Sequence, residues 1–99
     1  MAQFDVHRLA KRPGLVVDCQ ADLLNYIDTR FVVPLAPPDE VGRLTRRLNP
    51  VFEIEGVEYA LITQAAAAVR KSDLGAIIAS LTSHDREIID ALDILLTGV

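Results

Sequence analysis

Residues 51–61 alternate between apolar and polar side chains, and the pair Glu55-Gly56 interrupts the alternation once. A period of two places successive side chains on opposite faces of a β-strand. Two such runs separated by a short glycine-containing pair are typical of a hairpin. This is the clearest hairpin pattern in the chain, and it favours a domain built around an antiparallel sheet.

Three further apolar runs in the first third of the chain are typical of short strands. Pro13-Gly14 separates the first two runs and predicts a turn between antiparallel strands. Pro34 suits the end of the third run, because no ladder donor is needed there. The predicted strands cover residues 4–9, 15–20 and 30–35, followed by the two arms of the hairpin.

The four alanines at 65–68 allow two interpretations. Alanine favours a helix, whereas the flanking Ile62, Thr63 and Val69 favour a strand. The residues alone leave both conformations open.

A short helical segment is predicted between the prolines at 37–38 and the pair Asn49-Pro50. Val41, Leu44 and Leu48 recur there at helical spacing, which predicts one or two helical turns.

A longer amphipathic helix is predicted near the C-terminus. Residues 82–85 match the threonine-plus-acid form of a helix capping box. Ile88, Leu92 and Leu95 lie on one face with Ala91 beside them, and Gly98 ends the helix one residue before Val99.

Residues 1–99 correspond in length to one domain. The elements predict a mainly β (α+β) fold, in which a small antiparallel β-barrel of about five strands packs beside the C-terminal helix. Apolar residues make up 51% of the chain and the mean hydropathy is +0.27, which is slightly high for so small a domain. A two-fold homodimer is the commonest way to cover excess apolar surface.

The formal net charge of −4 and the pI of about 5.0 argue against direct binding to bare nucleic acid and favour a protein partner. The single cysteine, Cys19, cannot form an internal disulfide, which favours a reducing compartment. No signal-peptide pattern and no apolar run of about 20 residues is present, so we expect a cytoplasmic protein without membrane contact.

The sequence predicts neither catalysis nor a metal site. His7 and His84 lie near opposite ends of the chain, and neither belongs to a cluster with metal-ligand spacing. Cys19 lies in an apolar run, where a buried, unreactive thiol is the default. Asp18 and Asp22 are better explained as structural than as an acid pair. We therefore expect no catalytic residue, no cofactor and no enzyme activity.

Two basic groups stand out. Arg43, Arg46 and Arg47 have helical spacing, and Lys11-Arg12 forms a basic turn. Such groups are usually solvated faces, and the alternative is a docking surface for an acidic partner peptide.

Apolar character continues to the last residue of the chain. Leu95, Leu96 and Val99 cannot all share one narrow stripe with Leu92. Chain ends are usually polar unless something holds them, so a second protein surface is the simplest explanation for the remainder.

Taken from end to end, the order of short motifs resembles the CcdB family of toxins at nearly the family's full length. The motifs are Gln3-Phe4-x-Val6, Val17-Asp18-x-Gln20-x-Asp22, Val32-Val33-Pro34-Leu35-Ala36, Leu48-x-Pro50-Val51, Leu74-Gly75, Leu81-Thr82, Ala91 and Gly98-Val99.

The resemblance implies the toxin of a type II toxin–antitoxin system, a homodimer with the barrel, an extra hairpin and a C-terminal helix near the two-fold axis. Family members bind the DNA gyrase A subunit and trap the topoisomerase with cleaved DNA, and a CcdA-like antitoxin releases it. Such systems serve plasmid maintenance, and toxin and antitoxin together repress their own operon, the one setting in which the resemblance implies contact with nucleic acid.

By position, the gyrase-binding patch corresponds to two groups of residues. Leu23 and Leu24 follow the second strand, where ordinary core packing is the alternative interpretation. The others lie at the end of the helix: Asp93, Leu96, Thr97, Gly98 and Val99. The antitoxin is expected to contact Lys11, Arg12, Arg43, Arg46 and Arg47.

The chain departs from the family at Thr97, where poison-active members carry a tryptophan. Loss of an interface residue worth about 2 kcal/mol weakens binding roughly thirty-fold. Two alternatives therefore stand beside a gyrase inhibitor: a non-toxic CcdB-like interaction module, and a MazF-like endoribonuclease, which shares the barrel but fits an acidic chain poorly.

Overall fold

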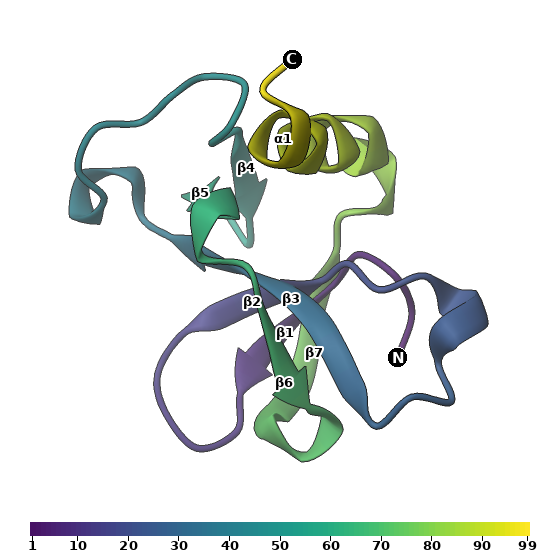
Figure 1. Ribbon diagram of the computed structural model, residues 1–99. Helices are drawn as coiled ribbons and strands as arrows, with labels where there is room; N and C mark the ends of the chain where they lie inside the picture. The colour runs from purple at the N-terminus through teal and green to yellow at the C-terminus, as the bar shows by residue number, and fades with distance from the viewer.

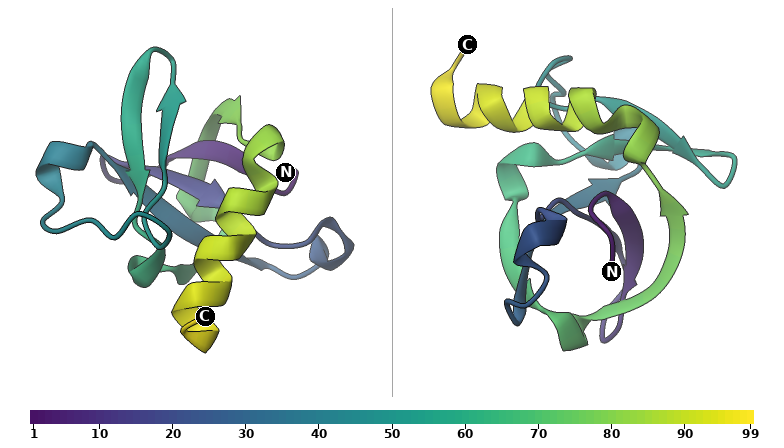
Figure 2. Two further views of the ribbon diagram at one scale, coloured as in Figure 1. Left: turned by 90° about the horizontal axis from the view of Figure 1, so that it is seen from above. Right: turned by 90° about the vertical axis from the view of Figure 1, so that its right-hand side faces the viewer.

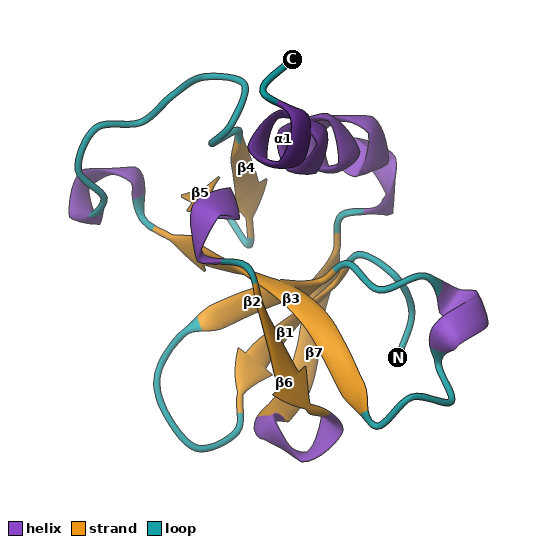
Figure 3. Ribbon diagram, viewed as in Figure 1, coloured by secondary structure: helices purple, strands orange, loops and turns teal.

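The computed structural model describes residues 1–99 and contains one seven-stranded antiparallel sheet with a single α-helix above it (Figure 1). The strands are β1 (Asp5–Leu9), β2 (Leu15–Asp18), β3 (Thr29–Ala36), β4 (Val51–Ile54), β5 (Val57–Leu61), β6 (Ala67–Arg70) and β7 (Leu74–Ser80). Single 3₁₀ turns are η1 (Asp22–Leu24), η2 (Pro38–Glu40), η3 (Thr63–Ala65), η4 (Lys71–Asp73) and η5 (Thr82–His84), and the helix is α1 (Asp85–Thr97). Figure 3 separates these elements by type.

β3 is shared by the two parts of the sheet. One edge pairs with β2, while the other pairs with β6 over its first half and with β5 at Leu35 and Ala36. Strands β6, β3, β2, β1 and β7 form a half-barrel that curves beneath α1 (Figure 2, right), and the β4–β5 hairpin extends from it. β6 pairs only with β3, and β7 pairs only with β1, so the half-barrel is open between β6 and β7.

The predicted mainly β fold with a C-terminal helix is confirmed, and all five predicted strands are present. The hairpin turn has positive φ at both central residues, 52° at Glu55 and 79° at Gly56, as a type I′ turn requires. The homodimer stays a prediction.

The sequence did not reveal β6 and β7. The alanines at 65–68 divide between η3 and β6, which resolves the ambiguous segment. In β7, Gly75 interrupts the apolar pattern, and it is needed because a Cβ there would lie 2.9 Å from the carbonyl oxygen of Arg8 in β1.

The short helix predicted at 41–48 is absent, and only one of the predicted one or two turns is present, at the end of the segment. The segment is a loop with one turn, closed by the Asn49 amide donating to the Thr45 carbonyl at 2.7 Å. Val41, Leu44 and Leu48 are only half-buried, so packing does not compensate for the cost of starting so short a helix.

The predicted capping box at 82–85 is also wrong. The Thr82 hydroxyl pairs with Ser80 Oγ at 2.8 Å, and no side chain caps the first turn of α1. The Gly98 stop is confirmed, because Gly98 has φ 77° and its amide donates to the Ile94 carbonyl at 2.9 Å.

The hydrophobic core lies between one face of the sheet and α1. Val17 and Val33 come from β2 and β3, Phe52 from β4, and Ile88 and Ala91 from the helix. The predicted apolar stripe of α1 is half-buried at Leu92 and turns toward solvent at Leu95. None of the helical segments has both the length and the apolar content needed to cross a bilayer.

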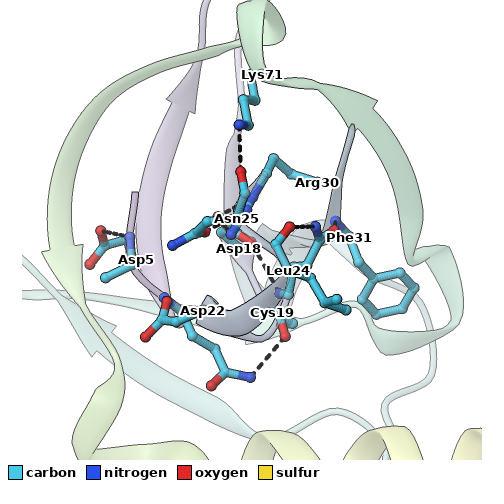
Figure 4. Close-up of polar contacts among 12 residues, drawn as sticks. Asp5, Asp18, Cys19, Asp22, Leu24, Asn25, Arg30, Phe31 and Lys71 are labelled. Atoms are coloured by element: carbon cyan, nitrogen blue, oxygen red, sulfur yellow. Dashed lines mark hydrogen bonds and ion pairs between the residues drawn. The ribbon is translucent and has the colours of Figure 1, made fainter. Parts of the chain in front are cut away.

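The opposite face of the strands is also buried, and it holds an ion pair. Arg30 Nε donates to Asp18 Oδ2 at 2.9 Å, and neither side chain is exposed (Figure 4). Arg30 Nη2 lies 2.8 Å from the same oxygen but approaches off axis, so it adds charge attraction rather than a second aligned hydrogen bond. Asp18 Oδ1 accepts from the Gln20 amide at 3.1 Å. The structural role expected for Asp18 is confirmed.

Replacing Asp18 by alanine leaves the Arg30 charge buried without its partner. We expect Asp18→Ala to lower the free energy of unfolding by about 3–5 kcal/mol. Urea denaturation followed by circular dichroism measures the change. The exposed Glu53→Ala serves as control and should change stability by less than about 0.5 kcal/mol. A loss below about 1 kcal/mol for Asp18→Ala would show that the fold does not depend on this pair.

Candidate functional site

The end of α1 presents an apolar tail to solvent. The exposed fraction is 79% at Leu96 and 83% at Val99. The Thr97 hydroxyl donates to the Asp93 carbonyl at 2.6 Å and accepts from the Val99 amide at 3.4 Å. The tail is therefore held against the helix end while its apolar side chains point away from the core. We call Leu96, Thr97, Gly98 and Val99 the tail.

The second group of predicted contact residues lies in η1, between β2 and β3. Leu23 is 87% exposed and Leu24 is 38% exposed. The alternative that these leucines belong to the core is therefore wrong. Tyr26, two residues further on, is 81% exposed.

Several hydrogen bonds hold the connection that carries η1, residues 21–28 (Figure 4). Arg30 Nη1 donates to Asn25 Oδ1 at 2.6 Å, and Lys71 Nζ donates to the Asn25 carbonyl at 2.6 Å. The Gln20 side chain donates to the Leu24 carbonyl at 3.0 Å and accepts from the Phe31 amide at 2.9 Å. The connection is thus tied to the buried ion pair and to η4.

The tail and η1 form two separate patches within one chain. Both views of Figure 2 show the tail projecting past the sheet, whereas η1 lies beside the strands of the half-barrel. Asp93, the remaining residue of the predicted patch, is exposed on α1 next to the tail. A single partner surface that contacts both patches must be broad.

The structure does not bring the two basic groups together. Lys11 and Arg12 lie in the β1–β2 loop at one end of the half-barrel, and the loop at 41–48 lies at the other end beside α1 (Figure 1). Arg47 makes two hydrogen bonds to Asp90 of α1, at 3.0 and 3.3 Å, and these raise its pKa. Lys11 lies 3.6 Å from Asp73.

Cys19, His7 and His84 each make their own separate contacts. Burial, together with the charge of Asp18, raises the pKa of Cys19 to about 12, so its thiol stays protonated near neutral pH. His7 is buried, with Nδ1 3.2 Å from the Gly75 carbonyl oxygen. His84 Nδ1 lies 2.9 Å from Glu87 Oε1 on the surface. No three His, Cys, Asp or Glu side chains meet in a group that could hold a metal ion.

Sequence reasoning overlooked Tyr26, Asn25 and Lys71. Residues 25–29 read as an ordinary polar connection, and an aromatic residue inside it was the one available indication of a contact surface. The partners of Asn25 lie in β3 and η4, so no local pattern could have shown that its position is held.

A family model described as CcdB protein matches residues 3–98. Solved structures with a similar fold include an endoribonuclease from a mycobacterial species in complex with its cognate antitoxin, with TM-score 0.78 and 16% identity over 97% of this chain and 94% of that one. Others are an endoribonuclease from a mycobacterial species, with TM-score 0.80 and 16% identity over 97% and 90% of the two chains, and the Mycobacterium tuberculosis toxin MazF-mt6, with TM-score 0.76 and 13% identity over 93% and 95%. These likenesses show the fold alone. Because the family match spans nearly every residue, the chain belongs to the CcdB family of toxins from toxin–antitoxin systems.

Proposed function

We propose that this protein inhibits DNA gyrase by binding its A subunit through the tail and η1. The observation that carries the proposal is the pair of fixed apolar patches, centred on Leu96 and Val99 and on Leu23, in a member of the CcdB family. Exposed apolar side chains held by a rigid scaffold suit a protein partner, because little conformational freedom is lost on binding. No catalytic residue takes part, and the protein acts in the cytoplasm.

The active form in this proposal is a homodimer. A two-fold dimer presents each patch twice and can match the two-fold axis of a dimeric topoisomerase. In a dimer the partner supplies a second tail and a second η1, so the separate patches of one chain can be used together with those of the other. The exposed apolar residues of the monomer support this part of the proposal.

Thr97 bears on the strength of the inhibition. Its hydroxyl is used to hold the tail, so the contact surface there consists of Leu96 and Val99 without an aromatic side chain. We expect weaker gyrase binding than a tryptophan at this position would provide. If the loss is complete, the protein is a non-toxic CcdB-like module that still binds its antitoxin.

A CcdA-like antitoxin is the second proposed partner. Arg43 and Arg46 are exposed in the loop beside α1 and make no ion pair within the chain, so they remain available to an acidic peptide. Arg47 is engaged with Asp90, and Lys11 and Arg12 contribute from a distance. In this proposal, toxin and antitoxin together also repress their own operon and serve plasmid maintenance.

RNA cleavage is the second candidate function, because two of the solved structures with a similar fold are endoribonucleases. His84 beside Glu87 is the surface pair best suited to proton transfer in such a reaction. The net charge of −4 opposes binding of an RNA backbone.

Removing the apolar side chains of the tail should weaken gyrase binding without affecting the fold. Leu96→Ala with Val99→Ala should weaken binding of purified gyrase A by at least about tenfold, because both side chains are exposed and available for contact. Calorimetric titration measures the affinity, and the melting temperature should stay within about 2 °C. The control Ile77→Ala alters an exposed residue of β7 and should bind as the wild type does. Equal affinity for the tail variant would exclude the tail as a contact.

Arg43 and Arg46, in the loop at 41–48, predict an effect on the affinity for the antitoxin and none on the affinity for gyrase A. Arg43→Glu with Arg46→Glu should weaken the complex with the antitoxin by about tenfold or more, since two favourable charge contacts become repulsive. Titration at two salt concentrations should show a steeper salt dependence for the wild type. Arg70→Glu is the matched control, because Arg70 is an exposed basic residue at the end of β6 that belongs to neither basic group. Unchanged affinity of the double variant would contradict the assignment.

The two candidate functions predict different results with RNA. If the protein inhibits gyrase, purified protein leaves total RNA intact while reducing supercoiling of plasmid DNA by gyrase. Electrophoresis of both substrates after incubation distinguishes the two. RNA fragments that disappear in His84→Ala would instead establish the endoribonuclease.

A further inference from the structure

We propose that Tyr26 is a principal contact for gyrase A and that Asn25 and Lys71 are positioning residues for it. This inference rests on the proposed function, and it adds a contact residue that neither the motifs nor the tail indicated.

Tyr26 differs from the other aromatic residues of the chain. Phe4 and Phe52 are buried in the core, Tyr59 is half-buried against it, and Phe31 is 39% exposed. Tyr26 is 81% exposed and lies on the same connection as Leu23. A largely exposed aromatic ring is typical of a contact surface, and tyrosine is enriched among residues that dominate binding energy.

The backbone on both sides of Tyr26 is held. On the N-terminal side, Asn25 accepts from Lys71 through its carbonyl and from Arg30 through its side chain, each at 2.6 Å. On the C-terminal side, the Asp28 carbonyl accepts from the Lys71 amide at 3.0 Å. The Ile27 amide also donates to the Leu24 carbonyl at 3.2 Å, which closes a turn around Tyr26.

Two of these contacts connect the turn around Tyr26 to other parts of the half-barrel. Arg30 is the buried partner of Asp18, and Lys71 begins η4, between β6 and β7. Residues 21–26 are all exposed, so these hydrogen bonds do not serve to bury the connection. They keep the exposed ring in one place, and a preorganised contact loses less conformational entropy when it binds.

Tyrosine suits this arrangement because it has a large apolar surface and few rotatable bonds. Leu23 and Tyr26 are three residues apart on two successive turns of the same connection, so one partner surface can reach both. The chain contains no tryptophan, and Tyr26 is its most exposed aromatic side chain. It therefore supplies the aromatic contact that the tail lacks.

The experiment measures the affinity of full-length protein for purified gyrase A by calorimetric titration. Tyr26→Ala should bind at least about tenfold more weakly, whereas Tyr26→Phe should stay within about twofold, because the ring rather than the hydroxyl makes the contact. Both variants should keep the wild-type melting temperature. Val57→Ala, an exposed apolar residue of the β4–β5 hairpin, is the control and should not change the affinity.

Lys71 tests the positioning role. Lys71→Met keeps the aliphatic stem but loses the donor to Asn25, so binding should weaken by about fivefold and amide exchange at residues 24–27 should become faster. Lys71→Arg restores a donor and should recover most of the affinity. A Lys71→Met variant with faster exchange and unchanged affinity would overturn the positioning role.

The outcomes separate this inference from the proposed function. If wild-type protein binds gyrase A and Tyr26→Ala binds within twofold of it, the role of Tyr26 is overturned while the proposed function stands. If the wild type does not bind gyrase A, the proposed function fails, and the assignment of Tyr26 as a gyrase contact fails with it.

Discussion

The buried ion pair of Asp18 and Arg30 connects two central strands of the sheet to the η1 connection, which carries one of the two patches of the proposed interface. It joins the neighbouring strands β2 and β3 on the face away from the core, and Arg30 continues the contact to Asn25 in the η1 connection. Buried ion pairs add little net stability compared with apolar pairs of similar size, but removal of one partner is costly. In this protein Arg30 of the pair also donates a hydrogen bond to Asn25, and Lys71 donates to the same residue from η4.

The candidate interface is an arrangement of exposed ends rather than a cleft. The tail lies at the end of a helix whose first half is packed into the core, and η1 lies in a connection held by the half-barrel. Both therefore combine exposed apolar side chains with a fixed backbone. The same general fold occurs in endoribonucleases, so the fold by itself does not determine the chemistry. Membership in the CcdB family comes from the order of residues along the chain.

The local predictions succeeded where sequence pattern and packing agreed. The hairpin at 51–61 formed because Phe52 and Ile54 are buried while Glu53 and Glu55 face water, and its turn accepts positive φ. The segment at 41–48 failed although its apolar residues have helical spacing, because those residues have too little core to pack against. The capping box failed because Thr82 lies in η5 and α1 begins only at Asp85, and the Thr82 hydroxyl pairs with Ser80 instead. A local pattern describes what a segment can form, and packing selects among the possibilities.

The sequence by itself determined the five main strands, the amphipathic helix with its Gly98 stop, and the family, because each is encoded in neighbouring residues or in their order. Only the tertiary structure decided that Arg30 pairs with Asp18, that Arg47 is engaged with Asp90, and that Leu23 and Tyr26 face solvent. Those outcomes depend on contacts between segments far apart in the chain. Their partners are chosen by the curvature of the sheet and the path of the connections, which periodicity within a segment does not contain.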